Sequence, residues 1–159
     1  MTKACFCGTF DPLTRGHLDV IQRASRLFDQ VYVFICVNSE KKETFSKEKR
    51  LEWLEKETRN MGNVICQTHE GLTIEACHKV GSSILIRGIR NILDFEYEKN
   101  IEAMNRKIDP SIDTVYLITD PEYAHCSSSN VRELLKYGQD ISSLVPECVA
   151  RDLKRCENE

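Results

Sequence analysis

Short apolar runs alternate with stretches of helical periodicity along the whole chain. Five runs rich in β-branched or apolar residues predict strands, at Ala4–Cys7, Val31–Val37, Val64–Gln67, Ser83–Arg87 and Thr114–Ile118. In the segments that follow them, apolar residues recur every three or four positions, which is typical of an amphipathic helix. The pattern therefore predicts strands and helices in alternation.

Six segments predict helices, at Gly16–Asp29, Lys47–Met61, Thr73–Val80, Asn91–Lys107, Ser129–Tyr137 and Pro146–Arg155. Ser46 is a plausible N-cap for the second, and proline stands at the first position of the last. In the long fourth segment Tyr97, Ile101 and Met104 align on one side.

Strands that alternate with helices form parallel βαβ units with right-handed crossovers. We therefore expect a Rossmann-like, doubly wound α/β fold: a five-stranded parallel sheet of order 3-2-1-4-5, with C-terminal helices, in a single domain over residues 1–159. In such sheets ligands bind beyond the carboxyl ends of the strands, where the strand order reverses. The site is expected between the first and fourth strands.

Composition and net charge limit the kinds of molecule that the protein is expected to bind. The 41% hydrophobic and 30% charged residues indicate a globular chain, and the net charge of −3 provides no general basic surface for nucleic acid or an anionic membrane. Phosphate recognition must then be local. Gly8, Asp11 and Pro12 interrupt the N-terminus too early for a signal peptide, and we expect a cytoplasmic protein.

The eight cysteines are expected to be reduced. Several fall in predicted strands, where a free thiol behaves as a small buried hydrophobe. No C-x-x-C pair or finger-type histidine spacing occurs, so no metal site is expected. Cys5 and Cys7 would share one face of a strand, which leaves a metal or redox role as the alternative.

The loop after the first strand, Gly8–His17, contains the most unusual chemistry. Gly8 removes a side chain where a ligand could approach the backbone, while Gly16 and His17 open a helix whose free N–H groups favour an anion. His17 is expected to point its ring toward that anion. In isolation, a histidine at this position could merely cap the helix or pack.

The tetrad Thr14-Arg15-Gly16-His17 resembles the [HT]-x-G-H signature of the nucleotidylyltransferase superfamily. Further segments resemble the bacterial phosphopantetheine adenylyltransferases over nearly the whole chain: GTFDPLTRGHLD, Lys41–Lys42, LIRGIRNILDFEYE, MNR at 104–106 and the serines at 127–129. Two positions depart from the pattern, with Cys7 where proline is common and Cys126 where isoleucine is common. They put two thiols near the expected nucleotide site.

The resemblance implies that 4′-phosphopantetheine attacks the α-phosphate of ATP, which yields dephospho-coenzyme A and pyrophosphate. It also implies Mg²⁺ with the ATP, a homohexamer and coenzyme A as a possible feedback inhibitor. The attacking phosphate is largely dianionic near neutral pH, because its second pKa is about 6, so no general base is needed. Catalysis should consist of positioning and electrostatics.

The same resemblance assigns roles to residues. The catalytic set is His17, Lys41 and Arg90, and the acceptor set is Thr9, Lys41, Thr73 and Arg87. The ATP set comprises Thr9, Phe10, His17, Gly88, Ile89, Arg90, Glu98, Tyr123, Ala124, His125, Cys126, Ser127, Ser128 and Ser129. His17 would donate a hydrogen bond to the α-phosphate as that group becomes five-coordinate.

Each assignment has a simpler alternative. Lys41 could be an ordinary solvated cation, Arg87 and Arg90 could pair with Asp94 or Glu98, and the serines could act only as a helix cap. Phe95 and Tyr97 are expected in the core or at a subunit interface, not against the base.

Two other functions also compete with the main interpretation. One is a sibling enzyme, such as a nicotinamide mononucleotide adenylyltransferase or a glycerol-phosphate cytidylyltransferase. The other is a non-catalytic, nucleotide-binding regulator on the same fold.

Overall fold

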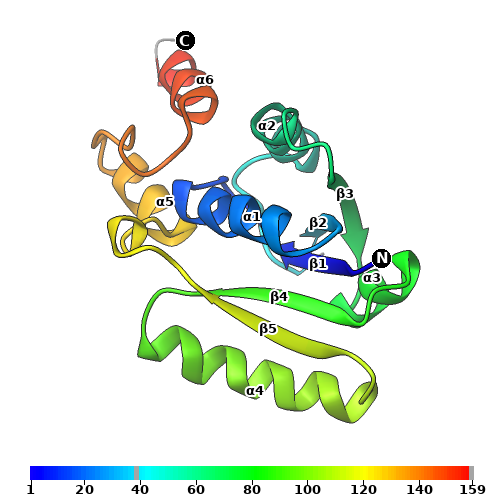
Figure 1. Cartoon of the computed structure of the whole chain (residues 1–159). Coiled ribbons are helices and arrows are strands. Elements are labelled where there is room, and N and C mark those ends of the chain that lie inside the picture. Colours follow the sequence, from blue (N-terminus) through cyan, green and yellow to red (C-terminus); the bar gives the residue numbers. More distant parts are fainter. Residues whose placement is uncertain (38–39, 158–159) are drawn as a thin grey trace.

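The computed structural model describes residues 1–37 and 40–157, in which five parallel strands form one sheet covered by helices on both faces (Figure 1). The strands are β1 (Lys3–Gly8), β2 (Gln30–Val37), β3 (Val64–Glu70), β4 (Ile84–Ile89) and β5 (Asp113–Ile118). Their order is β3-β2-β1-β4-β5, so the predicted fold class and strand order are confirmed.

The helices are α1 (Arg15–Leu27), α2 (Lys47–Thr58), α3 (Thr73–Val80), α4 (Ile92–Ile108), α5 (Ser128–Lys136) and α6 (Glu147–Glu157). Figure 1 shows α1 and α2 on one side of the sheet and α4 on the other. Residues of α5 and α6 join the hydrophobic core that contains those of α1 and α2.

Alternate residues of β1 face the two helical layers. Phe6 pairs in register with Val33 of β2 and Ile86 of β4, and all three are buried in the core under α1 and α2. Cys5 and Cys7 point the other way, into a second core shared with α3. A central parallel strand is covered on both faces, which explains why β1 is apolar at consecutive positions.

Several element boundaries differ from the sequence prediction. β3 continues beyond Gln67 to Glu70, because it stays paired with β2 as far as the Val37–Glu70 pair. α2 ends at Thr58, where the Met61 amide bonds to the Thr58 carbonyl and turns the chain toward β3.

Near the C-terminus the differences are smaller. α5 begins one residue earlier than predicted, at Ser128, and Pro146 precedes α6 instead of opening it. A 3-10 turn over Pro121–Tyr123, labelled η1, was not predicted.

The apolar stripe of α4 faces outward in this chain. Phe95 and Tyr97 are 42% and 66% exposed, so the core alternative for these residues is wrong for the single chain. Met104, which aligns with Tyr97 on the helix, is also exposed. Within the described residues, none of the helices combines the length and apolarity that a membrane span requires.

Candidate active site

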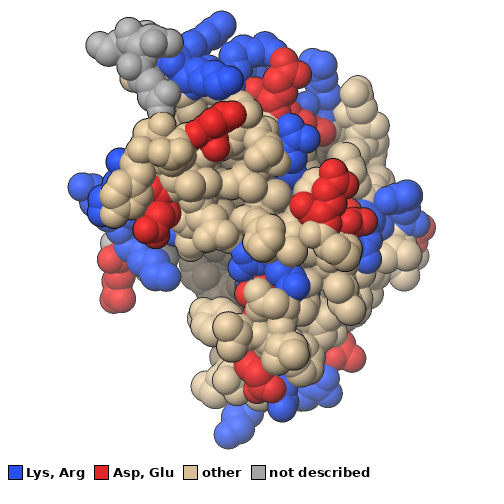
Figure 2. All heavy atoms as spheres, turned by 90° about the vertical axis from the view of Figure 1, so that its left-hand side faces the viewer, with Lys and Arg blue, Asp and Glu red and all other residues tan. Residues whose placement is uncertain are grey.

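A crevice of about 420 Å³ opens at the carboxyl edge of the sheet, between β1 and β4, as the strand order predicts. Figure 2 looks onto this edge and shows the hollow, with basic side chains beside it. Most of the predicted site residues line it: Thr9, Phe10, His17, Lys41, Arg87, Gly88, Arg90, Glu98, Cys126, Ser127, Ser128 and Ser129.

Five predicted contact residues do not line the crevice: Thr73, Ile89, Tyr123, Ala124 and His125. Thr73 begins α3 after the edge strand β3, two strands away from β1, and Ile89 is buried. Tyr123 ends η1 and lines a separate hollow beside Arg15 of α1. The unpredicted turn thus carries this segment away from the crevice.

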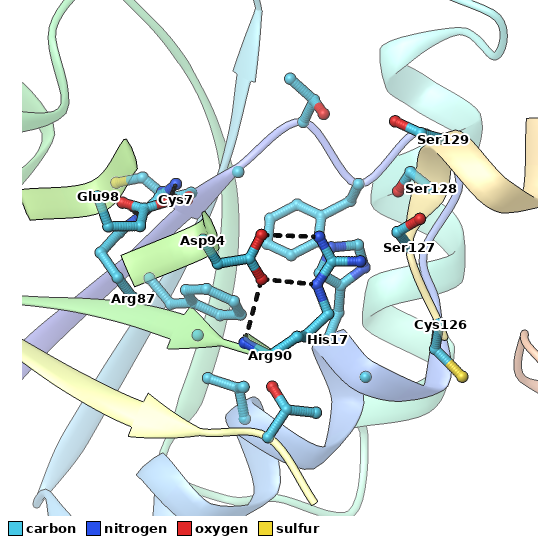
Figure 3. A pocket seen from close by; sticks show the side chains of 18 of the residues that line it. Cys7, His17, Arg87, Arg90, Asp94, Glu98, Cys126, Ser127, Ser128 and Ser129 are labelled. Carbon is cyan, nitrogen blue, oxygen red and sulfur yellow. Dashed lines mark hydrogen bonds and ion pairs between the residues drawn. The ribbon is translucent and has the colours of Figure 1, made fainter. Parts of the chain in front are cut away.

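His17 is held in the first turn of α1 by a reciprocal cap. Thr14 is the N-cap: its hydroxyl accepts from the His17 amide at 3.3 Å, and its own amide donates to His17 Nδ1 at 3.0 Å. Because Nδ1 accepts this hydrogen bond, a neutral His17 carries its ring proton on Nε2. The His17 ring and the Arg90 side chain both line the crevice (Figure 3).

The surroundings keep His17 neutral. Burial, followed by the positive charges of Arg90 and Arg87, lowers the pKa of His17 to about 3. A neutral imidazole with its proton on Nε2 is a hydrogen-bond donor throughout the physiological pH range. His17 is therefore a fixed N–H donor in a cationic crevice, as the predicted role requires.

Phe10 packs against the His17 ring. Its ring is almost fully buried and meets the His17 ring edge to face, with centroids 4.9 Å apart. Its φ of 48° is in the left-handed region, a strain that usually persists only where the surrounding structure enforces it. A Cβ on Gly8 would come within 3.2 Å of this ring, so glycine there makes room for Phe10.

Arg87 lies in β4, two residues before the strand ends, and its guanidinium group is held on two sides. Its Nε and Nη2 donate to the two carboxylate oxygens of Glu98 at 2.7 and 2.6 Å, and Nη1 donates to the Cys7 carbonyl at 2.6 Å. Three of the five guanidinium N–H groups are used, so two remain for a ligand. Glu98 is buried and acts here as the anchor of Arg87.

Arg90 is held in a similar way by Asp94, one turn into α4. Nε and Nη2 of Arg90 donate to the Asp94 carboxylate at 2.9 and 3.2 Å (Figure 3). The ion pairs weighed as an alternative to phosphate contact therefore exist. They orient both guanidinium groups and still leave N–H donors at the crevice.

The serines close the crevice at the N-terminus of α5 (Figure 3). Ser127 is the N-cap and accepts from the Asn130 amide, and the Ser128 hydroxyl donates to the Pro12 carbonyl at 2.8 Å. The Thr14 hydroxyl donates to the Cys126 carbonyl at 3.0 Å. These bonds join two helix N-termini side by side, and such termini favour anions.

Arg132 is a lining residue that sequence reasoning missed. It lies in α5 and lines both the crevice and an adjoining cavity of about 160 Å³. Thr9 and Lys41 also line both spaces. An arginine four positions after Ser128, on the same helical face, was the available signal.

Positive charge predominates in the crevice although the chain is net negative. The charged lining residues are the cations Lys41, Arg87, Arg90 and Arg132 and the carboxylates Asp94 and Glu98, each of which is bound to an arginine. With two helix N-termini and a neutral histidine donor beside them, this arrangement suits a polyanion. It can hold and neutralise phosphate groups, and a phosphate nucleophile that is already ionised needs no general base.

Comparison with known proteins agrees with this chemistry. Residues 5–134 match the family described as cytidylyltransferase-like. The chain is 42% identical over 158 residues to a phosphopantetheine adenylyltransferase of Finegoldia magna, covering 99% of this chain and 98% of the relative. It is 44% identical over 150 residues to one of Streptococcus pneumoniae, with 94% and 93% covered.

Among solved structures, a Vibrio parahaemolyticus protein described as a candidate nicotinate-nucleotide adenylyltransferase is similar, with a TM-score of 0.67. The match covers 96% of this chain and 91% of that chain. At 19% identity this similarity concerns the fold alone.

Proposed function

The chain belongs to the cytidylyltransferase-like family and, within it, to the phosphopantetheine adenylyltransferases, and we propose that its crevice transfers the adenylyl group of ATP to 4′-phosphopantetheine. A phosphate oxygen of the acceptor attacks the α-phosphorus of ATP, and the bond to the β-phosphate breaks. The products are dephospho-coenzyme A and pyrophosphate. The enzyme thereby serves coenzyme A biosynthesis.

The acceptor phosphate is proposed to bind on the β1–β2 side of the crevice. Thr9 and Lys41 lie there, and Arg87 of β4, which also lines the crevice, has two N–H groups without a partner among the hydrogen bonds described. Three positively polarised donors around one dianion would hold the nucleophile without removing its charge. Thr73 does not line this side, so it has no side-chain role in the proposal.

ATP is proposed to bind on the α1–α5 side. Arg90, the backbone at Gly88 and the serines at 127–129 would meet its phosphates, with Phe10 as the floor. A Cβ on Gly88 would lie 3.0 Å from Val20, so glycine allows α1 to approach β4 closely at this point. Glu98 contributes by orienting Arg87.

The observation that carries the mechanism is the Thr14–His17 hydrogen bond. It leaves Nε2–H of a neutral imidazole as the free donor, next to the cations that would hold both phosphates. Charge accumulates on the α-phosphoryl oxygens as the attacking and leaving oxygens come into line. A donor fixed in advance stabilises that charge more than it stabilises the ground state.

Mg²⁺ is proposed to enter as a complex with ATP. Asp94 and Glu98, the carboxylates that line the crevice, are each occupied by an arginine. Phosphate oxygens and water are the usual partners of Mg²⁺ in such reactions. The ion would neutralise part of the triphosphate charge.

Pyrophosphate release tests the proposal. Purified protein is incubated with Mg²⁺ and ATP, and the acceptor is 4′-phosphopantetheine, nicotinamide mononucleotide or glycerol phosphate. Of the three acceptors, we expect only 4′-phosphopantetheine to give pyrophosphate. Release with another acceptor would support the sibling enzyme, and ATP binding without any release would support the regulator.

We also propose that one domain carries this activity, in a cytoplasmic homohexamer. The exposed apolar residues of α4 outside the crevice, among them Ile92, Leu93 and Met104, favour burial against other copies. Coenzyme A shares the skeleton of the proposed product and would compete for the same crevice. The mass measured by light scattering tests the homohexamer. Inhibition of pyrophosphate release by added coenzyme A tests the competition.

A further inference from the structure

Arg50, on α2, carries a charge into the interior. It is 0% exposed, although α2 could fill that position with an apolar side chain. Replacing a buried ion pair by a well-packed apolar residue is often neutral or stabilising. A buried arginine is therefore a poor choice for stability alone, and its contacts indicate what it does.

Arg50 bridges the loop after β1 and the loop after β2. Its Nη1 donates to the Thr9 carbonyl at 2.7 Å, and its Nη2 forms an ion pair with Glu43 at 2.6 Å. Thr9 belongs to the first loop, and Glu43 stands two residues after Lys41 in the second. A rigid guanidinium fork can hold two segments in one geometry, which a flexible lysine cannot.

Asp11 makes a second bridge between the same loops. Its Oδ2 accepts from the Thr44 amide at 2.8 Å and its Oδ1 accepts from the Phe45 amide at 2.9 Å. The Asp11 side chain is buried, and the Asp11 carbonyl accepts from Arg132 Nη1 at 2.7 Å. Three adjacent residues thus attach the segment after Lys41 to the β1 loop: Glu43 through Arg50, and Thr44 and Phe45 through Asp11.

We propose that Arg50 and Asp11 are positioning residues that hold Lys41 opposite Thr9 and so set the geometry of the acceptor-phosphate site. Lys41 itself is exposed and long, and a lysine ammonium by itself holds no fixed geometry. Its placement must come from the backbone that carries it. The identity of the acceptor substrate rests on the proposed function. The clamp, by which we mean the two bridges that Arg50 and Asp11 make between the β1 loop and the β2 loop, does not.

The first test measures the clamp without any substrate. In Asp11→Asn, one amide must face a side-chain NH₂ in place of an oxygen, so hydrogen exchange at Thr44 or at Phe45 should accelerate at least tenfold. Leu54→Ala, a core substitution on the same α2, is the matched control and should lower the melting temperature without this local change. Unchanged exchange at Thr44 and Phe45 would overturn the clamp.

The second test measures positioning. Asp11→Asn and Arg50→Lys should raise KM for 4′-phosphopantetheine about tenfold and leave KM for ATP within about twofold, whereas Leu54→Ala should change neither. Combined with Lys41→Met, Asp11→Asn should not raise the acceptor KM further, because the Asp11 carboxylate acts through the segment that carries Lys41. Additive losses, or equal losses for both substrates, would overturn the positioning role.

A third measurement separates this inference from the proposed function. Affinity for inorganic phosphate, measured by calorimetry, should fall about tenfold in Asp11→Asn and in Lys41→Met, but not in Leu54→Ala. If wild-type protein fails to use 4′-phosphopantetheine, the proposed function is wrong. The phosphate affinities then still decide whether Asp11 positions Lys41, and an unchanged affinity in Asp11→Asn would refute it.

Discussion

The Thr14 amide donates to Nδ1 of His17 across 3.0 Å, and the Thr14 hydroxyl accepts from the His17 amide. The pair has the reciprocal form of a capping box, with histidine at the position that glutamate or glutamine usually occupies. One ring nitrogen serves the helix and the other faces the crevice. The helix-capping contribution of His17 and its proposed catalytic role can therefore be separated by substitution.

His17→Gln should separate them. Glutamine at this position can still accept from the Thr14 amide, whereas the imidazole Nε2–H is lost. We expect kcat to fall by roughly 10²–10³ with the melting temperature close to wild type. His17→Ala should lose the same kcat and also about 1 kcal/mol of stability, because the cap is removed. A His17→Gln protein that keeps its kcat would exclude His17 from the mechanism.

Stability should depend on pH through His17. Its pKa is lowered to about 3 in the folded chain, against 6.5 as the ordinary value. Between these values the unfolded chain binds a proton that the folded chain does not, so stability falls as pH falls through this window. Relative to His17→Gln, wild type should lose about 1 kcal/mol per pH unit below about pH 6. Urea denaturation from about pH 7.5 to about pH 5 measures this, and a constant difference would contradict it.

Lys41→Met should affect the acceptor more than ATP. Losing one charge-assisted contact to a phosphate should cost about 1.5–3 kcal/mol in acceptor binding or in the transition state. Lys42→Met is the matched control, since Lys42 lines only the adjoining cavity and not the crevice. Separate titrations of ATP and acceptor distinguish the two variants. A larger acceptor defect in Lys42→Met would show that the wrong lysine was assigned.

Glu98→Gln should weaken both the fold and the acceptor site. It removes the carboxylate that binds Arg87 through two hydrogen bonds in a mostly buried position, which should cost about 2–3 kcal/mol of stability. The less buried Asp94→Asn should cost about 1 kcal/mol or less. Urea denaturation compares the two, and equal losses would contradict the burial argument.

The thiols should differ in reactivity. All eight are expected to titrate as free thiols in denaturant. In the native protein the exposed Cys156 should react first and Cys36 next, because hydrogen bonding from the Cys7 thiol lowers the pKa of Cys36 against the opposing effect of burial, with a smaller lowering by the Arg87 charge. Burial raises the pKa of Cys126, and burial, followed by Glu57, raises that of Cys148 to about 12. Mass spectrometry of timed labelling gives the order, and faster labelling of Cys126 than of Cys36 would contradict it.

The sequence by itself determined the local elements and the site loop. Apolar spacing predicted the five strands and six α-helices that the described residues form, and Ser46 was identified as the cap of α2. These features depend on periodicities of two and 3.6 residues and on caps within one turn, so they can be read locally. The expected strand order placed the site between the first and fourth strands, and the tetrad Thr14–His17, known from its family resemblance, lies in the loop after the first.

Only the tertiary structure decided which groups pair and which atoms remain free. Arg50 reaches Thr9 across 41 positions and Arg132 reaches Asp11 across 121, distances over which no periodicity carries information. The unpredicted turn at Pro121–Tyr123 directs Tyr123 away from the crevice. Sequence pattern ranks residues by burial and local geometry, whereas charge pairing, tautomer and ligand access depend on the path of the whole chain.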